Sequence, residues 1–164
     1  MQNHTLIIAE AGVNHDGSLE TACSLADVAA EAGADAVKFQ TFRAEDLVAA
    51  DAPQAEYQRR NIGRTESQFD MIRRLQLTAG DFGALSDHCR KRGIRFLSTP
   101  FDPASLDLLV DEIGVDLLKF SSGDITNAPL LLQGARSGLP VILSTGMSTM
   151  PEIEEALGVL AWGY

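Results

Sequence analysis

The 164-residue sequence predicts an α/β protein of the (β/α)8 TIM-barrel type, with only about the first five β/α units present. Short apolar runs alternate with helical segments, and strict alternation implies a parallel sheet with right-handed crossovers. Two of these runs, Gly33–Phe39 and Gly114–Phe120, share the pattern G-x-D-x-x-K-F. Polar residues stand at the carboxyl end of every expected strand, which is the face where barrels hold their active sites. The alternative is an open doubly wound sheet, but the chain has neither G-x-G-x-x-G after its first strand nor a P-loop.

The expected strands are apolar runs too short for helices. They cover Thr5–Glu10, Ala36–Thr41, Ile94–Thr99, Asp116–Phe120 and Val141–Ser144. The expected helices show helical spacing of apolar residues and are bounded by capping residues, proline or glycine. They cover Leu19–Ala32, Ala79–Arg92, Pro103–Ile113, Ala128–Ser137 and Pro151–Leu160. Gly33, Gly93 and Gly138 end three of them, Thr78 is a candidate cap, and Pro103 suits a first helical turn.

The segment from Phe42 to about Gln76 is polar and irregular, with helical pieces expected around Ala55–Arg60 and Gln68–Leu75. No interdomain linker is visible. Since a barrel of this kind needs eight strands, the first and fifth strands would be exposed edges. We therefore interpret residues 1–164 as the N-terminal portion of a larger barrel protein or as a truncated chain.

The formal net charge of −10 argues against a nucleic-acid or anionic-membrane binder, although a local pocket can still bind a small anion. No apolar run approaches the roughly 18 residues of a membrane span. Cys23 and Cys89 lie in helical patterns and are expected to pack as small apolar residues in a reducing compartment. Met1–Thr5 leads directly into a strand without a signal-peptide pattern, so a cytoplasmic location is expected.

Two lysines are the strongest candidates for a binding site. Strand alternation puts Lys38 and Gln40 on one face of the second strand, and Lys119 on the matching face of the fourth. Alternate barrel strands contribute to one side-chain layer, so both ammonium groups are expected in the barrel mouth at similar height. A buried lysine is costly unless it meets an anion, although a lysine at a strand end can also reach solvent. The matched pair favours a phosphate or carboxylate ligand.

Other candidates have an ordinary structural explanation beside the functional one. Glu10 and the loop that holds His15 offer a base, or simply turn chemistry. Loops Ser121–Asp124 and Ser144–Met147 offer hydroxyls and N–H groups to an anion, or only helix entry. Asp102 is a candidate cap. The basic residues are expected to cover helix faces, in two clusters: Arg59, Arg60 and Arg64, and Arg90, Lys91, Arg92 and Arg95. His4, His15 and His88 lack metal-ligand spacing.

At the level of motifs the chain resembles the sialic acid (N-acetylneuraminate) synthases and the related nonulosonate synthases. Five segments match in order along nearly all of the sequence. They are IIAEAGVNHDG (Ile7–Gly17), AGADAVKFQTF (Ala32–Phe42), FLSTPFD (Phe96–Asp102), LLKFSSGDITNAPLL (Leu117–Leu131) and VILSTGM (Val141–Met147).

The resemblance implies a (β/α)8 barrel followed by a small antifreeze-like domain, in a homodimer. It implies a transferase that joins phosphoenolpyruvate to an open-chain N-acyl sugar, such as N-acetylmannosamine or its 6-phosphate, and releases phosphate. By the family pattern, phosphoenolpyruvate would be held by Lys38, Thr99, Lys119, Ser122 and Ser144. The sugar would be contacted by Glu10, Gln40 and Asp124. The residues expected to take part in catalysis are Glu10, Lys38 and Lys119.

The resemblance also implies a divalent metal, Mn2+ or Mg2+, in the full-length enzyme. The family's two metal-binding histidines belong to the second barrel half, so no metal ligand is expected in this chain. The antifreeze-like domain, which lends an arginine to the sugar site, is expected to be absent as well. Asp124 stands where many members carry glutamate. The isolated chain is therefore predicted to be inactive or poorly folded.

Three alternatives stay open. The sugar acid could be legionaminate, pseudaminate or a spore-coat polysaccharide precursor. The chain could be a non-catalytic fragment that binds anions or a partner barrel half. It could also belong to another phosphate-using barrel, such as an aldolase that forms a Schiff base on Lys38 or Lys119.

Overall fold

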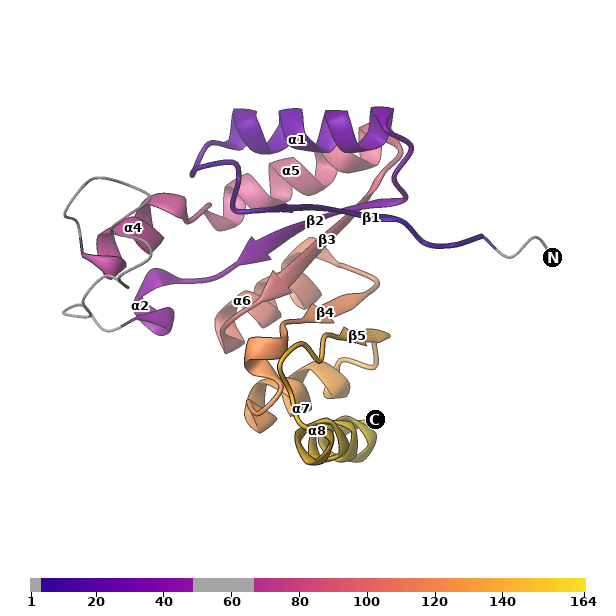
Figure 1. Ribbon diagram of the computed structural model, residues 1–164. Helices are drawn as coiled ribbons and strands as arrows, with labels where there is room; N and C mark the ends of the chain where they lie inside the picture. The colour runs from indigo at the N-terminus through magenta and orange to yellow at the C-terminus, as the bar shows by residue number, and fades with distance from the viewer. Residues whose placement is uncertain (1–3, 49–66) are drawn as a thin grey trace.

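A computed structural model describes residues 4–48 and 67–164, in which parallel strands alternate with helices (Figure 1). The strands are β1 (Ile8–Gly12), β2 (Ala36–Thr41), β3 (Arg95–Pro100), β4 (Leu118–Phe120) and β5 (Val141–Leu143). The α-helices are α1 (Leu19–Glu31), α2 (Ala44–Leu47), α4 (Gln68–Leu75), α5 (Ala79–Arg92), α6 (Pro103–Asp107), α7 (Ala128–Arg136) and α8 (Met150–Gly163). A π-helical stretch, Leu108–Ile113, follows α6, and a short 3-10 turn, Ser122–Asp124, follows β4.

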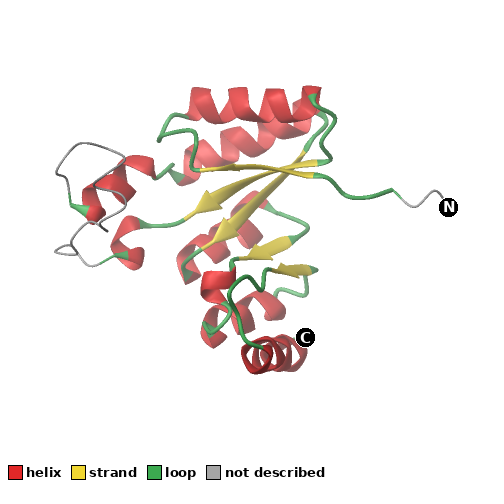
Figure 2. Cartoon of the chain, in the orientation of Figure 1, coloured by secondary structure: helices red, strands yellow, loops and turns green. Residues whose placement is uncertain are grey.

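The strands form two parallel ladders in chain order, β1-β2-β3 and β4-β5 (Figure 2). Parallel pairing and sequential order confirm the predicted α/β class and agree with the first strands of a (β/α)8 barrel, while closure into eight strands stays a prediction. β4 is two residues shorter than expected. Asp116, assigned to that strand from the sequence, instead lies outside the ladder and pairs with Arg95 at 2.6 Å.

Each ladder buries one face against helices. Val37, Phe39 and Phe96 pack with α1 and α5, which lie side by side over β1–β3 in Figure 1. Leu118 and Phe120 pack with α7 and α8. Because successive strand residues point to opposite faces, the lysines of β2 and β4 are left on the face away from these helices. We call this the inner face, and the predicted alternation of both strands is confirmed.

Local capping chemistry sets several helix ends where the sequence predicts them. Thr78 and Asp81 form a capping box at the start of α5, and Gly93 ends that helix in the left-handed conformation. Asp102 caps α6 by accepting the backbone N–H of Ser105 at 2.7 Å. The single helix predicted over Pro103–Ile113 is wrong in detail, because α-helical hydrogen bonding gives way to a π-helix after residue 107.

β1 also differs from its predicted bounds. It ends at Gly12 rather than Glu10, and its register with β2 shifts between these two residues. Gly12 has φ 55°, a left-handed conformation that accommodates such an irregularity at little steric cost. Glu10 therefore lies inside the strand and opposite Lys38 in the ladder.

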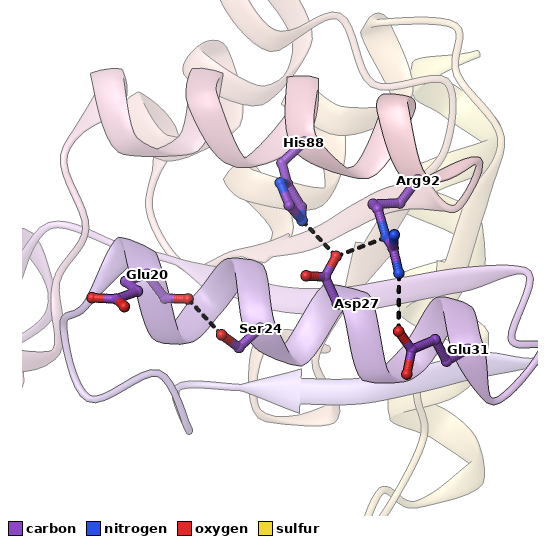
Figure 3. A network of polar contacts seen from close by, with 6 residues as sticks. All are labelled: Glu20, Ser24, Asp27, Glu31, His88 and Arg92. Atoms are coloured by element: carbon purple, nitrogen blue, oxygen red, sulfur yellow. Dashed lines mark hydrogen bonds and ion pairs between the residues drawn. The ribbon is translucent and has the colours of Figure 1, made fainter.

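Polar contacts join α1 to α5 (Figure 3). Asp27 on α1 lies 2.7 Å from His88 Nε2 and 2.9 Å from Arg92 Nε, and Arg92 also contacts Glu31 at 3.1 Å. Basic residues of the second predicted cluster thus pair within the chain, as expected for a helix surface. Arg59, Arg60, Arg64 and the helical piece expected at 55–60 lie outside the described residues.

Both cysteines are free. Cys89, on α5, is buried in the core that α1 and α5 form with the first ladder, and burial raises the pKa of its thiol to about 12. Cys23 packs against the same core, which confirms that both act as small apolar residues. Across the described segments, every helix is too short or too polar to cross a bilayer.

Candidate functional site

Lys38 lies on the inner face of β2 and is paired with Glu10 of β1. Its Nζ lies 2.6 Å from Glu10 Oε2. The lysine side chain is only 11% exposed, whereas the glutamate side chain is 59% exposed. β-ladder register explains the pairing, since the two residues are direct neighbours across parallel strands. The Lys38 side chain is therefore largely buried, whereas the Glu10 carboxylate that pairs with it is exposed.

Lys119 lies on the inner face of β4 and binds groups at the carboxyl end of its own ladder. Its Nζ donates to Ser144 Oγ at 2.6 Å and to the Phe120 carbonyl at 2.8 Å. Burial lowers the pKa of the Lys119 ammonium, and the positive charge of Lys38 lowers it further, while Glu10 raises it. The fold thus brings three predicted residues, Lys38, Lys119 and Glu10, within electrostatic reach of one another.

Two further predicted residues meet on the inner face of β2 and β3. Gln40 and Thr99 are direct register partners. Thr99 is 2% exposed, and within the described parts of the chain its Oγ1 has no hydrogen-bond partner. An unsatisfied buried hydroxyl is costly, so this oxygen is available to a ligand.

The side chains of Glu10 and Gln40 both lie close to Gly12. A Cβ added at Gly12 would lie 3.3 Å from Glu10 Oε1 and 3.7 Å from Gln40 Nε2. The carboxylate and the amide therefore border the same small space, which the missing side chain of Gly12 keeps open.

The loops after β4 and β5 also come together. A Cβ on Gly146 would lie 3.4 Å from Ser122 Oγ, so the hydroxyl of one loop faces the glycine of the other. Asp124 is half-buried, burial raises the pKa of its carboxyl, and its Oδ2 has no hydrogen-bond partner among the described residues. The pKa rises because burial disfavours the charged carboxylate and too few hydrogen-bond donors reach its oxygens to compensate.

Of the two alternatives left open for the β4 loop, the contacts of three backbone N–H groups agree with turn chemistry. Gly123 N donates to Ser121 Oγ at 3.1 Å, Asp124 N donates to the Ser121 carbonyl at 3.1 Å, and Ile125 N donates to Ser122 O at 3.4 Å. These are turn contacts, so the hydroxyl of Ser122 is what this loop offers a ligand.

His15 is buried to 1% exposure beside Phe39, a position that the sequence does not predict. Its Nδ1 accepts the Gly17 N–H at 3.1 Å, which places the ring hydrogen on Nε2. Burial lowers the pKa of the imidazole despite the nearby Asp16 carboxylate, so the ring is neutral at pH 7. The bond to Gly17 helps hold the β1–α1 loop, and within the described part of the chain no hydrogen bond joins His15 to Lys38 or Lys119.

A pocket that the sequence does not reveal adjoins Gln40. Its volume is about 170 Å3, and it lies between the ends of β2 and β3, the loop after β1, and helices α2 and α4. Besides Gln40 its lining is apolar and includes Val13, Phe42, Leu47, Ile72, Leu75 and Phe101. The apolar residues of α4 look like ordinary core positions in the sequence, which gives no signal of a cavity.

The described residues do not fit a divalent-cation site by themselves. No group of three or more His, Cys, Asp or Glu side chains is gathered within residues 4–48 and 67–164. Glu10 is already paired with Lys38, and Asp124 has a side-chain hydrogen bond with Asn127 that leaves only its Oδ2 without a partner among the described residues.

Comparisons with known proteins agree with this arrangement. The chain matches the NeuB family over residues 25–163. It is 49% identical over 156 residues to N,N'-diacetyllegionaminic acid synthase of Campylobacter jejuni, covering 95% of this chain and 46% of that protein. It is 47% identical over 151 residues to the synthase of the same name from Legionella pneumophila, covering 92% of this chain and 42% of that protein.

A solved structure shows the same fold. N-acetylneuraminic acid (sialic acid) synthetase from Leptospira borgpetersenii, in complex with citrate, superposes with a TM-score of 0.81 at 36% identity. The match covers 98% of this chain and 51% of that one. The chain thus spans about half the length of the relatives it matches.

Proposed function

We propose, because this chain belongs to the NeuB family of sugar acid synthases, that it carries the phosphoenolpyruvate-binding side of such an enzyme. The reaction would join phosphoenolpyruvate to an N-acylmannosamine-type sugar and form a sialic acid or related nonulosonate. Phosphate would be released.

The observation that carries the proposal is the pair of lysines on the inner face. Two ammonium groups in a partly buried space repel each other, which is why Lys38 contributes to the lowered pKa of Lys119. A dianionic or trianionic ligand between them would offset that repulsion. Phosphoenolpyruvate carries both a phosphate and a carboxylate. The unpartnered Thr99 hydroxyl, Ser144 and Ser122 would supply hydrogen bonds.

The remaining predicted residues would act on the sugar. Glu10 and Gln40 border the space beside Gly12, and Asp124 lies on the loop after β4. C3 of phosphoenolpyruvate would form a bond to the aldehyde carbon of the open-chain sugar as the C=O π bond breaks, and the aldehyde oxygen would take up the proton released by the water that adds at C2. Water would add at C2, and the C2–O bond to phosphate would then break. The lysines would stabilise the negative charge of the phosphate as it leaves, and Glu10 would accept a hydrogen bond from a sugar hydroxyl.

The similarity to two diacetyllegionaminic acid synthases favours a diacetamido sugar over N-acetylmannosamine. Pseudaminate and spore-coat precursors remain the other candidates, and a panel of these sugars would decide between them. A divalent metal, a homodimer and a cytoplasmic location stay predictions.

Calorimetric titration of the chain with phosphoenolpyruvate tests the anion site. Losing one charge-assisted hydrogen bond costs about 1.5–3 kcal/mol, so Lys38→Met and Lys119→Met should each weaken binding about 10- to 150-fold. Lys91→Met is the matched control, because Lys91 is exposed on α5, on the far side of the sheet. Equal affinity in all four proteins would refute the proposal.

Borohydride treatment in the presence of pyruvate distinguishes a synthase from the aldolase alternative. A Schiff-base aldolase would become covalently modified at Lys38 or Lys119, whereas a synthase would not. Stable modification of either lysine would favour the aldolase.

A further inference from the structure

We infer that the apolar pocket beside Gln40 receives the acyl tail of the amino sugar and limits its length. The inference rests on the proposed function and adds the part of the substrate that this chain itself recognises.

The pocket has the chemistry of an acyl site. An N-acyl group ends in a methyl and is joined to the sugar by an amide. The lining offers apolar side chains from α2, α4 and the strand ends, together with one polar group, the amide of Gln40. That amide can both donate to and accept from another amide. Among the described residues, none of the lining side chains carries a charge, so these residues offer a phosphate or carboxylate no partner.

The pocket and the candidate site share one residue, Gln40. Gln40 belongs to the inner-face row of β2 that contains Lys38, and its Nε2 borders the space at Gly12 that Glu10 also borders. A sugar whose hydroxyls meet Glu10 would therefore bring its amide to Gln40 and its acyl tail to α4. The reacting end would remain toward the lysines.

The volume of the pocket also sets which acyl tails it can hold. A volume of about 170 Å3 exceeds that of one methyl group, so N-propionyl and N-butanoyl tails should be accepted as well as N-acetyl. Leu75, a half-buried residue of α4, lines the pocket and is the residue whose size should set the limit. A methylene in an apolar pocket is worth about 10- to 200-fold in discrimination.

Photo-crosslinking tests the inference directly. The probe is a diacetamido sugar with a diazirine in one acyl tail, added to the chain with phosphoenolpyruvate and competed with the unmodified diacetamido sugar. Mass spectrometry then maps the labelled residues. We expect competed labelling on α4 or at Phe101. Leu75→Phe should reduce it at least 10-fold, while Leu75→Ala should shift preference toward N-butanoyl competitors. Leu157→Phe, at an exposed position of α8, is the matched control and should label normally.

The outcomes separate the two proposals. Competed labelling confined to residues outside the lining, with normal phosphoenolpyruvate affinity, overturns the acyl site and leaves the proposed function standing. Phosphoenolpyruvate binding without any competed labelling overturns the acyl site and the sugar half of the function. If Leu75→Phe does not fold, the map of the unmodified chain and the competitor preference of Leu75→Ala still decide.

Discussion

Gly134→Ala is expected to destabilise the chain because α7 approaches β4 too closely for a side chain. A Cβ at Gly134 would lie 2.5 Å from Phe120 Cζ and 2.8 Å from Phe120 Cε2. Phe120 is fully buried in the core under α7 and α8, so its ring has no free space to move into. The Phe120 carbonyl accepts a hydrogen bond from the Lys119 ammonium. A shift of Phe120 would therefore also disturb the candidate site.

Two opposing effects set the change in the free energy of unfolding caused by Gly134→Ala. Alanine is better than glycine in a helix interior by about 1 kcal/mol. Overpacking a closed core costs about 1–3 kcal/mol. Gly83→Ala on α5 isolates the first effect, because nothing lies within 4 Å of a Cβ at that position. We expect Gly83→Ala to be stabilised by about 0.5–1 kcal/mol and Gly134→Ala to fall about 1–3 kcal/mol below it.

Urea unfolding followed by circular dichroism measures both variants beside the unmodified chain. Thermal midpoints should separate them by several degrees, since 1 kcal/mol shifts a domain of this size by about 2–4 °C. A Gly134→Ala variant as stable as Gly83→Ala would refute the reasoning. It would mean that the Phe120 ring does not fill the space against α7.

Three further outcomes are expected. Asp124→Asn should be more stable than the unmodified chain at pH 7, since burial raises the carboxyl pKa and stability is lost as pH rises through that raised value. In urea titrations the advantage should vanish in acid, where the carboxyl is protonated in both folded and unfolded chains, and an advantage that persists there would contradict the reasoning. Affinity for phosphoenolpyruvate should fall as pH rises through the lowered pKa of Lys119, whereas Lys119→Arg should flatten that fall in calorimetric titrations. An unchanged profile in the variant would argue against Lys119 as the titrating group. Asp27→Asn should cost about 0.5–1 kcal/mol by removing the shared partner of His88 and Arg92, with the loss shrinking in 1 M salt. A loss independent of salt would mean that packing, not charge, holds α1 to α5.

Where local chemistry is decisive, the sequence predicts the fold closely. β2, α4 and α5 have the bounds expected from their residues. Thr78 and Gly93 mark the two ends of α5 through a capping box and a left-handed glycine, both of which depend on neighbouring residues only. The alternation of apolar and polar residues likewise assigns Lys38 and Lys119 to the inner face before any coordinates are known.

Features that depend on distant partners could not be predicted this way. The end of β1 at Gly12 depends on its pairing with β2, and the π-helix after α6 breaks a pattern that reads as one continuous helix. The sequence also left open whether the β4 loop offers its N–H groups to an anion or uses them in a turn, and in the structure three of them donate within the turn.

By itself the sequence determines the α/β alternation, the inner-face lysines and the family motifs, because these are written in residue type and spacing. Only the tertiary structure decides that Glu10 neutralises Lys38, that Lys119 reaches Ser144, and that a pocket opens beside Gln40. The physical reason is that these properties are distances between side chains from different strands and helices. Such distances are fixed by how the elements pack, which no single segment encodes.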